Sequence, residues 1–365
     1  MLLVDGLWFI AGLAALVVGA DTLVRGASKL ALSFGLSPLV VGLTIVAFGT
    51  SAPEMAVSVD AVLGGQTDIA VGNVVGSNIF NVLFILGASA LIVPLVVHIQ
   101  LIRQEVPIML GSSLLLIAFC LDGSVFLWEG MVLLLLLFAY TGFLIVQSRR
   151  QTATEVTEYA EEIHPSAPGA WDSSVWVQLA LVVGGLALLV VGADWLVNAA
   201  VAFARAFGVS DLVIGLTIVA AGTSMPEVAT SIAAALKGER DIAVGNVIGS
   251  NTFNVLGVVG ISGVAASTTG LTIDPSVLRF DLWVMLAVSF ACLPMFITGQ
   301  EIGRWKGALF LFYYVAYTAY LLMAAQQHES LQTFGTAMVW FVMPATVIML
   351  VTLAWRYQRS RNAAA

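Results

Sequence analysis

Two glutamates, Glu54 and Glu227, lie in the middle of long apolar stretches of this 365-residue chain. A carboxylate placed deep in a hydrophobic segment costs on the order of 3 kcal/mol even on lenient membrane-insertion scales, so it is a candidate functional group. Each glutamate directly follows a proline, and each is preceded by a Thr-Ser pair, Thr50–Ser51 or Thr223–Ser224. Carboxylate, hydroxyl and backbone oxygens are the ligands that hard cations prefer. The pattern therefore predicts a cation-binding site.

The two prolines, Pro53 and Pro226, predict a break in the helix beside each glutamate. A proline inside a helix leaves the carbonyl four residues earlier without its N–H partner, here at Gly49 and Gly222. Three other interpretations stay open: a simple kink, hydroxyls that bond back to their own helix, and a protonated glutamate bonded to a neighbouring helix. The repetition of the whole arrangement favours the cation site.

The arrangement repeats because two segments of the chain occur twice, always 173 residues apart. Residues 42–54 read GLTIVAFGTSAPE and residues 215–227 read GLTIVAAGTSMPE, with eleven of thirteen positions identical. Residues 68–83 read DIAVGNVVGSNIFNVL and residues 241–256 read DIAVGNVIGSNTFNVL, with fourteen of sixteen identical. Shared hydrophobicity alone does not produce such identity, so the sequence indicates an internal duplication.

The second repeated segment predicts a polar wall opposite the glutamates. Counted from the turn near Gly65, Glu54 and Ser77 each lie about 14–16 Å into the membrane at 1.5 Å per helical residue. The side chains expected to face the glutamates are Ser77, Asn78, Asn81, Ser250, Asn251 and Asn254. The alternative for each asparagine is a hydrogen bond that joins two helices.

Composition requires these motifs to lie in membrane-spanning helices. The sequence is 60% hydrophobic and only 10% charged, with a mean hydropathy of +1.00, which excludes a soluble domain. The apolar runs approach the ~20 residues that a helix needs to cross a bilayer. Eleven runs are predicted: 7–24, 38–63, 69–97, 106–121, 126–146, 175–197, 212–236, 242–266, 282–298, 308–325 and 337–353. The first run is interpreted as a span rather than a signal peptide, because it is preceded by the acidic residue Asp5 and by no basic residue.

The positions of the fourteen Lys and Arg residues predict the orientation. With the N-terminus outside and the C-terminus inside, twelve basic residues fall on the cytoplasmic side and only Arg205 and Arg279 fall outside. Each copy has five helices, an odd number, so the second copy is expected to be inverted relative to the first. The predicted fold is an all-α integral membrane protein with two inverted-topology repeats of five helices, 1–147 and 175–325. A cytoplasmic linker (148–174) joins them, and one extra helix with a basic tail (326–365) follows.

The motifs GTSAPE with GSNIFN, and GTSMPE with GSNTFN, resemble the repeats of the cation/calcium exchanger superfamily, especially its prokaryotic sodium/calcium exchangers. The resemblance covers about residues 7–325. It implies Ca²⁺/Na⁺ exchange by alternating access in a prokaryotic plasma (inner) membrane. It also implies Ca²⁺ ligands at Glu54, Glu227, Thr50 and Thr223, Na⁺ ligands at Ala47, Ser51, Ser77, Ala220, Ser224 and Ser250, and completion of the site by Asn81 and Asn254.

One departure concerns Asn254, where many sodium/calcium exchangers carry an aspartate. With two carboxylates left, coupling to H⁺ or K⁺ instead of Na⁺ stays an alternative within the superfamily. A channel is disfavoured because an inverted repeat suits alternating access. An intramembrane serine hydrolase is also disfavoured, because His98, His164 and His328 lie at span ends or in loops, too far out to act as its base.

The remaining polar and cysteine residues receive structural interpretations. Asp21 and Asp194 are expected to close the first helix of each copy near the membrane interface. Cys120 and Cys292 are interpreted as buried apolar residues. No cofactor is expected, and the expected partners are the lipid bilayer and small inorganic cations, with no nucleic acid and no obligate protein partner.

Overall fold

The structure is a computed structural model that describes residues 2–150 and 171–352. These residues form helices joined by short loops, with four strands of two residues each. Most of the predicted linker and the basic C-terminal tail, residues 151–170 and 353–365, lie outside the described residues, so what the sequence predicts for them stays a prediction.

The first half of the chain opens with one long helix, followed by shorter helices that are often continued by π-helical segments. The α-helices are α1 (Leu2–Phe34), α2 (Pro38–Val41), α3 (Ala47–Thr50), α4 (Ala52–Leu63), α5 (Thr67–Phe80), α6 (Gly87–Ile92), α7 (Val106–Cys120) and α8 (Leu127–Arg150). The π-helical segments are η1 (Gly42–Val46), η2 (Asn81–Leu86) and η3 (Leu101–Glu105).

The second half follows the same order of long, broken and continuous helices. Its α-helices are α10 (Val175–Ala206), α11 (Asp211–Ile214), α12 (Ala220–Gly222), α13 (Met225–Leu236), α14 (Arg240–Phe253), α15 (Gly260–Ala265), α16 (Leu282–Ile297), α17 (Arg304–Ala325) and α18 (Leu331–Ala337). The π-helical segments are η4 (Gly215–Val219), η5 (Asn254–Val259), η7 (Val277–Asp281) and η8 (Met338–Val342), and η6 (Ser267–Thr269) is a 3₁₀ turn.

The short strands connect the two halves of the chain. Strand β1 (Leu95–Val96) pairs antiparallel with β4 (Glu301–Ile302), and β2 (Ser124–Val125) pairs antiparallel with β3 (Leu271–Thr272). Each pair therefore joins a loop of the first half to a loop of the second half.

The described residues contain nine helices that are long and apolar enough to cross a membrane, or up to ten if a bent pair, Pro38–Thr50 with Ala52–Leu63, is one span. This confirms an all-α integral membrane protein. The seventh predicted run is divided between α11–α12 and the shorter apolar helix Met225–Leu236. The eleven crossings therefore stay a prediction.

The first helix of each half is longer than the sequence predicts. α1 continues to Phe34 and α10 to Ala206, well past Asp21 and Asp194. The prediction that these aspartates close their helices was wrong. No proline follows either aspartate within its helix, so no strong local signal stops the helix there.

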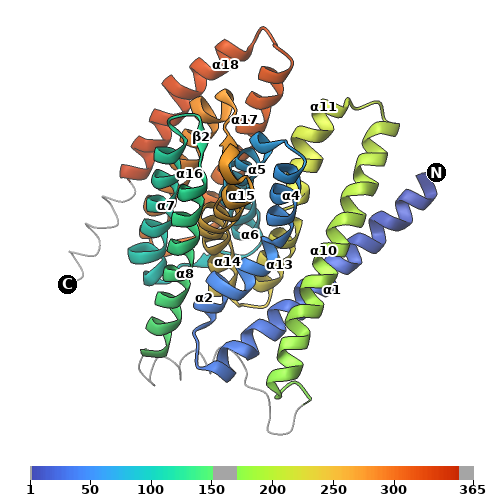
Figure 1. Cartoon of the computed structure of the whole chain (residues 1–365), viewed down its shortest axis with the longest axis vertical. Coiled ribbons are helices and arrows are strands. Elements are labelled where there is room, and N and C mark those ends of the chain that lie inside the picture. Colours follow the sequence, from blue (N-terminus) through green and yellow to red (C-terminus); the bar gives the residue numbers. More distant parts are fainter. Residues whose placement is uncertain (1, 151–170, 353–365) are drawn as a thin grey trace.

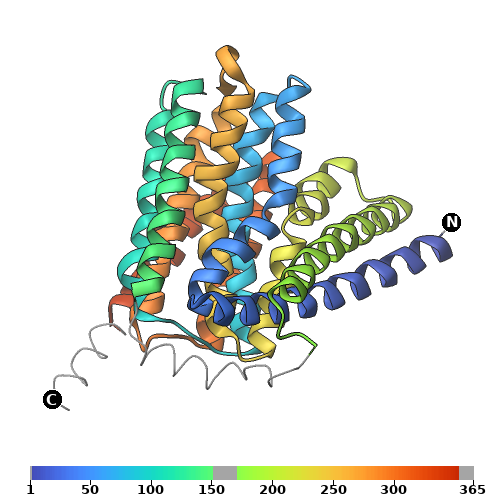
Figure 2. The same cartoon turned by 60° about the horizontal axis from the view of Figure 1, so that its bottom comes forward.

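Glycines bring α1 and α10 into direct backbone contact. A Cβ added at Gly185 would lie 2.6 Å from the Leu23 nitrogen, and one added at Gly12 would lie 2.6 Å from the Leu196 nitrogen. Small residues permit such close crossing of membrane helices. Figures 1 and 2 show the two helices side by side, tilted away from the remaining bundle.

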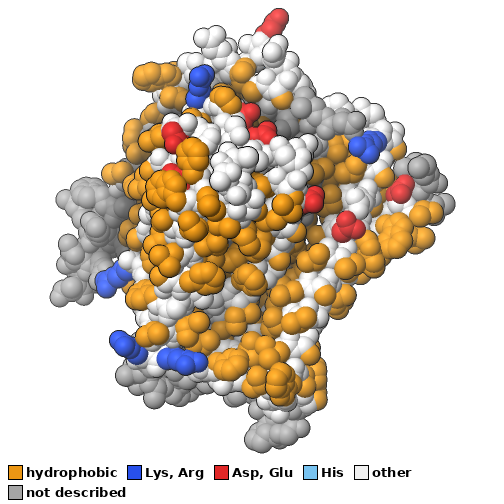
Figure 3. Space-filling view, viewed as in Figure 1, with side chains coloured by type: hydrophobic (Ala, Val, Ile, Leu, Met, Phe, Trp, Pro, Cys, Tyr) orange, Lys and Arg blue, Asp and Glu red, His pale blue; other side chains and the backbone are white. Residues whose placement is uncertain are grey.

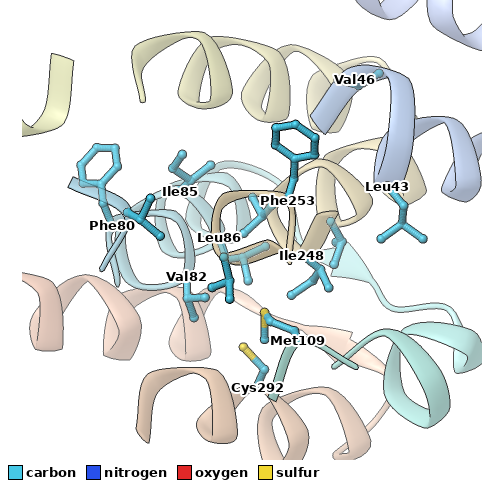
Figure 4. Close-up of a cluster of buried hydrophobic side chains, with 14 of the residues drawn as sticks. Leu43, Val46, Phe80, Val82, Ile85, Leu86, Met109, Ile248, Phe253 and Cys292 are labelled. Carbon is cyan, nitrogen blue, oxygen red and sulfur yellow. The ribbon is translucent and has the colours of Figure 1, made fainter. Parts of the chain in front are cut away.

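The centre of that bundle is built on α5 and α14. All twelve residues from Ile242 to Phe253 are buried. Figure 4 shows Phe80 and Ile248 of these two helices in one apolar cluster with Met109 of α7 and Cys292 of α16. Both cysteines are free and buried. On the outside, hydrophobic side chains cover most of the face seen in Figure 3, as expected for contact with lipid.

The α1–α10 contact predicts a large difference between two adjacent glycines. Gly185→Ala should destabilise the protein by about 1–3 kcal/mol because its methyl group would overlap the backbone of α1. Gly184→Ala is the matched control, since no described atom lies within 4 Å of its Cβ position. Thermal unfolding of both variants in detergent checks this, and equal midpoints would contradict the close packing.

Candidate cation site

Both glutamates follow a break in their helix. α3 ends at Thr50 and α4 begins at Ala52, with a bend of 41° between the two parts of the pair. In the second half α12 ends at Gly222 and α13 begins at Met225. The breaks predicted from Pro53 and Pro226 are therefore present in both halves. Each proline stands in the first turn of the new helix, where its missing N–H costs nothing.

The breaks place each carboxylate in the first turn of a helix. Glu54 lies in the first turn of α4 and Glu227 in the first turn of α13, and neither side chain is exposed to solvent. The N-terminal end of a helix carries a partial positive charge, which stabilises an anion there. The break thus places a helix end where it stabilises the buried negative charge.

Each carboxylate is held by a serine from the other half of the chain. Ser224 Oγ donates a hydrogen bond of 2.8 Å to Glu54 Oε1, and Ser51 Oγ donates one of 3.2 Å to Glu227 Oε1. The second oxygen of each glutamate, Oε2, is buried and has no hydrogen-bond partner among the described residues. Each carboxylate is therefore anchored through one oxygen and has the other available.

The predicted set contains further buried oxygens that have no hydrogen-bond partner among the described residues. They belong to Ser77, Asn81, Thr223, Ser250 and Asn254. An unpaired buried polar group costs about 1–3 kcal/mol, so a concentration of such atoms requires a physical explanation. Carboxylate and amide oxygens accept but cannot donate, hydroxyls can do either, and an all-oxygen set of this kind suits a hard cation. Four other unpaired side-chain atoms, at Ser89, Gln178, Thr230 and Ser262, lie outside the predicted set.

Two equivalent pairs of predicted residues, Thr50/Thr223 and Ala47/Ala220, differ between the two halves. The Thr50 hydroxyl bonds to Asn246 Oδ1 at 3.1 Å, whereas the Thr223 hydroxyl is unpaired. Ala47 is buried and its carbonyl accepts from the Ser51 N–H at 3.0 Å, whereas Ala220 is exposed. The two halves of the site thus have the same residues in unlike surroundings.

Sequence reasoning missed a set of residues that support the glutamates. Asn73 Nδ2 donates to the Glu54 carbonyl at 3.3 Å and to Ser58 Oγ at 3.0 Å. Asn246 Nδ2 donates to Ser231 Oγ at 3.0 Å in the same way. A signal was present, because both asparagines stand in the repeated GNV motif and both serines stand four residues after a glutamate, on the same helix face.

Asn78 and Asn251 join the two central helices. Asn78 Nδ2 donates to the Asn251 carbonyl and Asn251 Nδ2 donates to the Asn78 carbonyl, both at 3.2 Å. The interpretation of asparagine as a link between helices therefore applies to this pair. The described residues hold no cluster of three or more His, Cys, Asp or Glu side chains, so the site consists of two carboxylates and neutral oxygens.

The glycine-rich faces of α5 and α14 differ in what they contact. A Cβ added at Gly249 of α14 would lie 2.7 Å from Leu43 Cα of η1. The corresponding positions at Gly76 of α5 and Gly215 of η4 have no described atom within 4 Å. Gly249 is buried and Gly76 is partly exposed. At these positions the helix backbones touch on the α14 side and stand apart on the α5 side.

The chain matches the family model described as "Sodium/calcium exchanger protein" over residues 5–146 and 177–323. It is 41% identical over 334 residues to the "Putative antiporter CaxA" of Alkalimonas amylolytica, covering 89% of this chain and 100% of that protein. It is 33% identical over 351 residues to the "Sodium/calcium exchanger MaX1" of Methanosarcina acetivorans, covering 88% of this chain and 99% of that protein. A solved structure of the sodium-calcium exchanger NCX_Mj superposes with a TM-score of 0.74 at 31% identity, covering 88% of this chain and 100% of that one.

The unpaired carboxylate oxygens predict that cation binding depends on these two glutamates. Glu54→Gln and Glu227→Gln should each weaken Ca²⁺ binding at least about tenfold, or 1.4 kcal/mol, because each removes one of two charges facing the ion. Glu105→Gln is the matched control: Glu105 is equally buried, but Tyr140 and Gln100 donate hydrogen bonds to its two oxygens. Calorimetric titration in detergent checks this, and an equal loss in all three variants would contradict the assignment.

Proposed function

We propose that this chain, which belongs to the sodium/calcium exchanger family, is a secondary active antiporter that exchanges Ca²⁺ for Na⁺ across a membrane. The observation that carries the proposal is the pair of cross-bonded carboxylates, Glu54 and Glu227, each with one unpaired oxygen in a buried group of further unpaired oxygens. The chain is a transporter rather than an enzyme, and no cofactor enters the proposal.

The charge of the site suits Ca²⁺. Two carboxylates balance one divalent cation, and neither has a basic side chain among its hydrogen-bond partners in the described residues. We infer that Glu54 and Glu227 hold Ca²⁺ with the main-chain oxygens of Thr50 and Thr223. A hard divalent ion prefers such an all-oxygen set.

The hydroxyl and amide oxygens suit Na⁺. Ser51, Ser77, Ser224 and Ser250 supply neutral hydroxyls, the carbonyls of Ala47 and Ala220 supply main-chain oxygens, and Asn81 and Asn254 complete the set. Na⁺ bound there would compete with Ca²⁺ for the same two carboxylates, so the two ions could not be held together. Exchange becomes obligatory if, in addition, only a fully loaded site can change the side to which it is open.

We also propose that the two halves, 1–147 and 175–325, are inverted repeats joined by the linker 148–174. The reciprocal bonds Ser51–Glu227 and Ser224–Glu54 support this, because residues 173 positions apart exchange the same contact. The third segment, 326–365, would add one helix and a basic tail. Its described part is largely exposed in the isolated chain, as expected for a lipid-facing helix.

The unequal glycine contacts support alternating access. The face of α14 is closed against η1, whereas the equivalent face of α5 stands clear of η4. In the opposite state α5 would close on η4 and α14 would separate from η1, so the site would open to the other side. The structure then represents one of two related states.

Eleven crossings with the N-terminus outside would place the closed contact, between α14 and η1, on the cytoplasmic side of a prokaryotic inner membrane. Three basic residues assigned to that side form ion pairs along the C-terminal half of α1. Arg25 and Lys29 pair with Asp172, and Lys237 pairs with Asp21 at 2.7 Å. Their gathering there supports the orientation.

Reconstitution in liposomes tests the function. Purified protein in Na⁺-loaded vesicles, diluted into Na⁺-free buffer, should take up Ca²⁺ in wild type and lose that uptake in Glu54→Gln and Glu227→Gln. The Na⁺ gradient supplies the driving force, so vesicles without it should take up nothing. Ca²⁺ uptake driven instead by an imposed pH or K⁺ gradient would identify H⁺ or K⁺ as the coupling ion in place of Na⁺. Ca²⁺ flux that needs no counter-ion would indicate a channel.

The open glycine contact predicts a variant that binds but does not transport. Gly76→Val should leave Ca²⁺ binding intact, because its Cβ position is free in this state, and should slow exchange at least about tenfold by preventing α5 from closing on η4. Gly111→Val is the control, since Gly111 is exposed and its Cβ position is also free. Wild-type exchange by Gly76→Val in the liposome assay would contradict closure at this contact.

A further inference from the structure

Four asparagine side chains meet where α5 and η2 cross α14 and η5. They are buried, at most 2% exposed, and we call them the asparagine clasp: Asn78, Asn81, Asn251 and Asn254. Beside the two backbone bonds of Asn78 and Asn251, Asn81 Nδ2 donates to Asn251 Oδ1 at 3.0 Å. Asn254 Nδ2 donates to Asn78 Oδ1 at 3.1 Å. Every one of these bonds joins the first half of the chain to the second.

The clasp has only one consistent orientation of its amides. A backbone carbonyl can only accept, so the –NH₂ group of Asn78 must face the Asn251 carbonyl. Its oxygen then faces Asn254, which must present its own –NH₂ group. The same argument, begun at the Asn78 carbonyl, fixes Asn251 and then Asn81. A flipped amide at 81 or 254 would set two acceptors against each other.

This orientation decides which atoms remain available. With their –NH₂ groups engaged, Asn81 and Asn254 keep Oδ1 buried and unpaired. Asn81 begins η2, which packs on α13, the helix of Glu227. Asn254 begins η5, which packs on α4, the helix of Glu54. Each free amide oxygen therefore belongs to an element that touches a glutamate-bearing helix.

We propose that Asn78 and Asn251 are positioning residues that orient the amides of Asn254 and Asn81, so that both present oxygen rather than N–H to the transported cation. The inference rests on the proposed function, since it assumes that the site binds a cation. It assigns the pairs across the repeats: Asn78 acts through Asn254, and Asn251 acts through Asn81. Without its partner, an amide is free to turn its –NH₂ group toward the ion, which repels a cation.

A double-mutant cycle on Ca²⁺ affinity separates positioning from simple structural support. Asn254→Ala should weaken Ca²⁺ binding about tenfold by removing one ligand, and Asn78→Ala should weaken it by a similar factor. The double variant should be no weaker than Asn254→Ala alone, because Asn78 has nothing left to orient. Asn78→Ala with Asn81→Ala is the mismatched control, and its effects should multiply to about a hundredfold.

The mismatched pair is a sound control because Asn78→Ala keeps the backbone carbonyl that holds Asn251, and Asn251 still orients Asn81. A second cycle tests the same idea if one of these variants does not fold. In it, Asn251→Ala with Asn81→Ala is the matched pair, and Asn251→Ala with Asn254→Ala is the mismatched control. Multiplying effects in the matched pairs would overturn the positioning role and leave the exchanger proposal intact. Absence of Ca²⁺ binding in the wild type would overturn both.

Discussion

The buried charge of Glu54 and Glu227 is the constraint on which the rest of the structure depends. Two ionised carboxylates in the interior of a membrane protein are stable only if hydrogen bonds, helix ends or bound cations compensate for the lost water. The structure supplies the first two through Ser224, Ser51 and the helix breaks. It leaves one oxygen of each glutamate unpaired, so the compensation is incomplete without a cation. A site of this kind favours occupancy and still permits release.

That constraint explains why the central helices are interrupted and glycine-rich. In an unbroken helix the carbonyls accept hydrogen bonds within the helix, whereas the break at Thr50–Ala52 creates a helix end beside Glu54. Glycines such as Gly249 let α14 reach the backbone of η1 without an intervening side chain. A contact made largely of backbone atoms and glycine can form and separate with little rearrangement of side chains. The same surfaces can thus seal the site in one state and open it in another.

The asparagine clasp also explains why an amide fits at position 254. Its –NH₂ group donates to Asn78, and an ionised aspartate there would have no proton to donate. With asparagine at both 81 and 254, both amide oxygens of Asn78 and Asn251 receive a hydrogen bond. The two glutamates then remain the only carboxylates of the predicted set. Under the proposed function, the neutral oxygens would adjust the fit of the ion and the glutamates would supply the attraction.

The sequence by itself determined the class of protein and the duplication, and it predicted a cation site. Hydropathy identified membrane helices, and the proline-glutamate motif with its Thr-Ser pair identified the breaks, because these signals are local. Helix ends without a local signal were misplaced, as at Asp21, and Asn73 was not recognised as a support for Glu54. Only the tertiary structure decided that Ser224 bonds Glu54 and Ser51 bonds Glu227, that Asn78 joins the helices, and that one glycine contact is closed and its equivalent open. Two nearly identical segments have the same local preferences, so the difference between them depends on which neighbours they pack against, and that is a property of the folded chain.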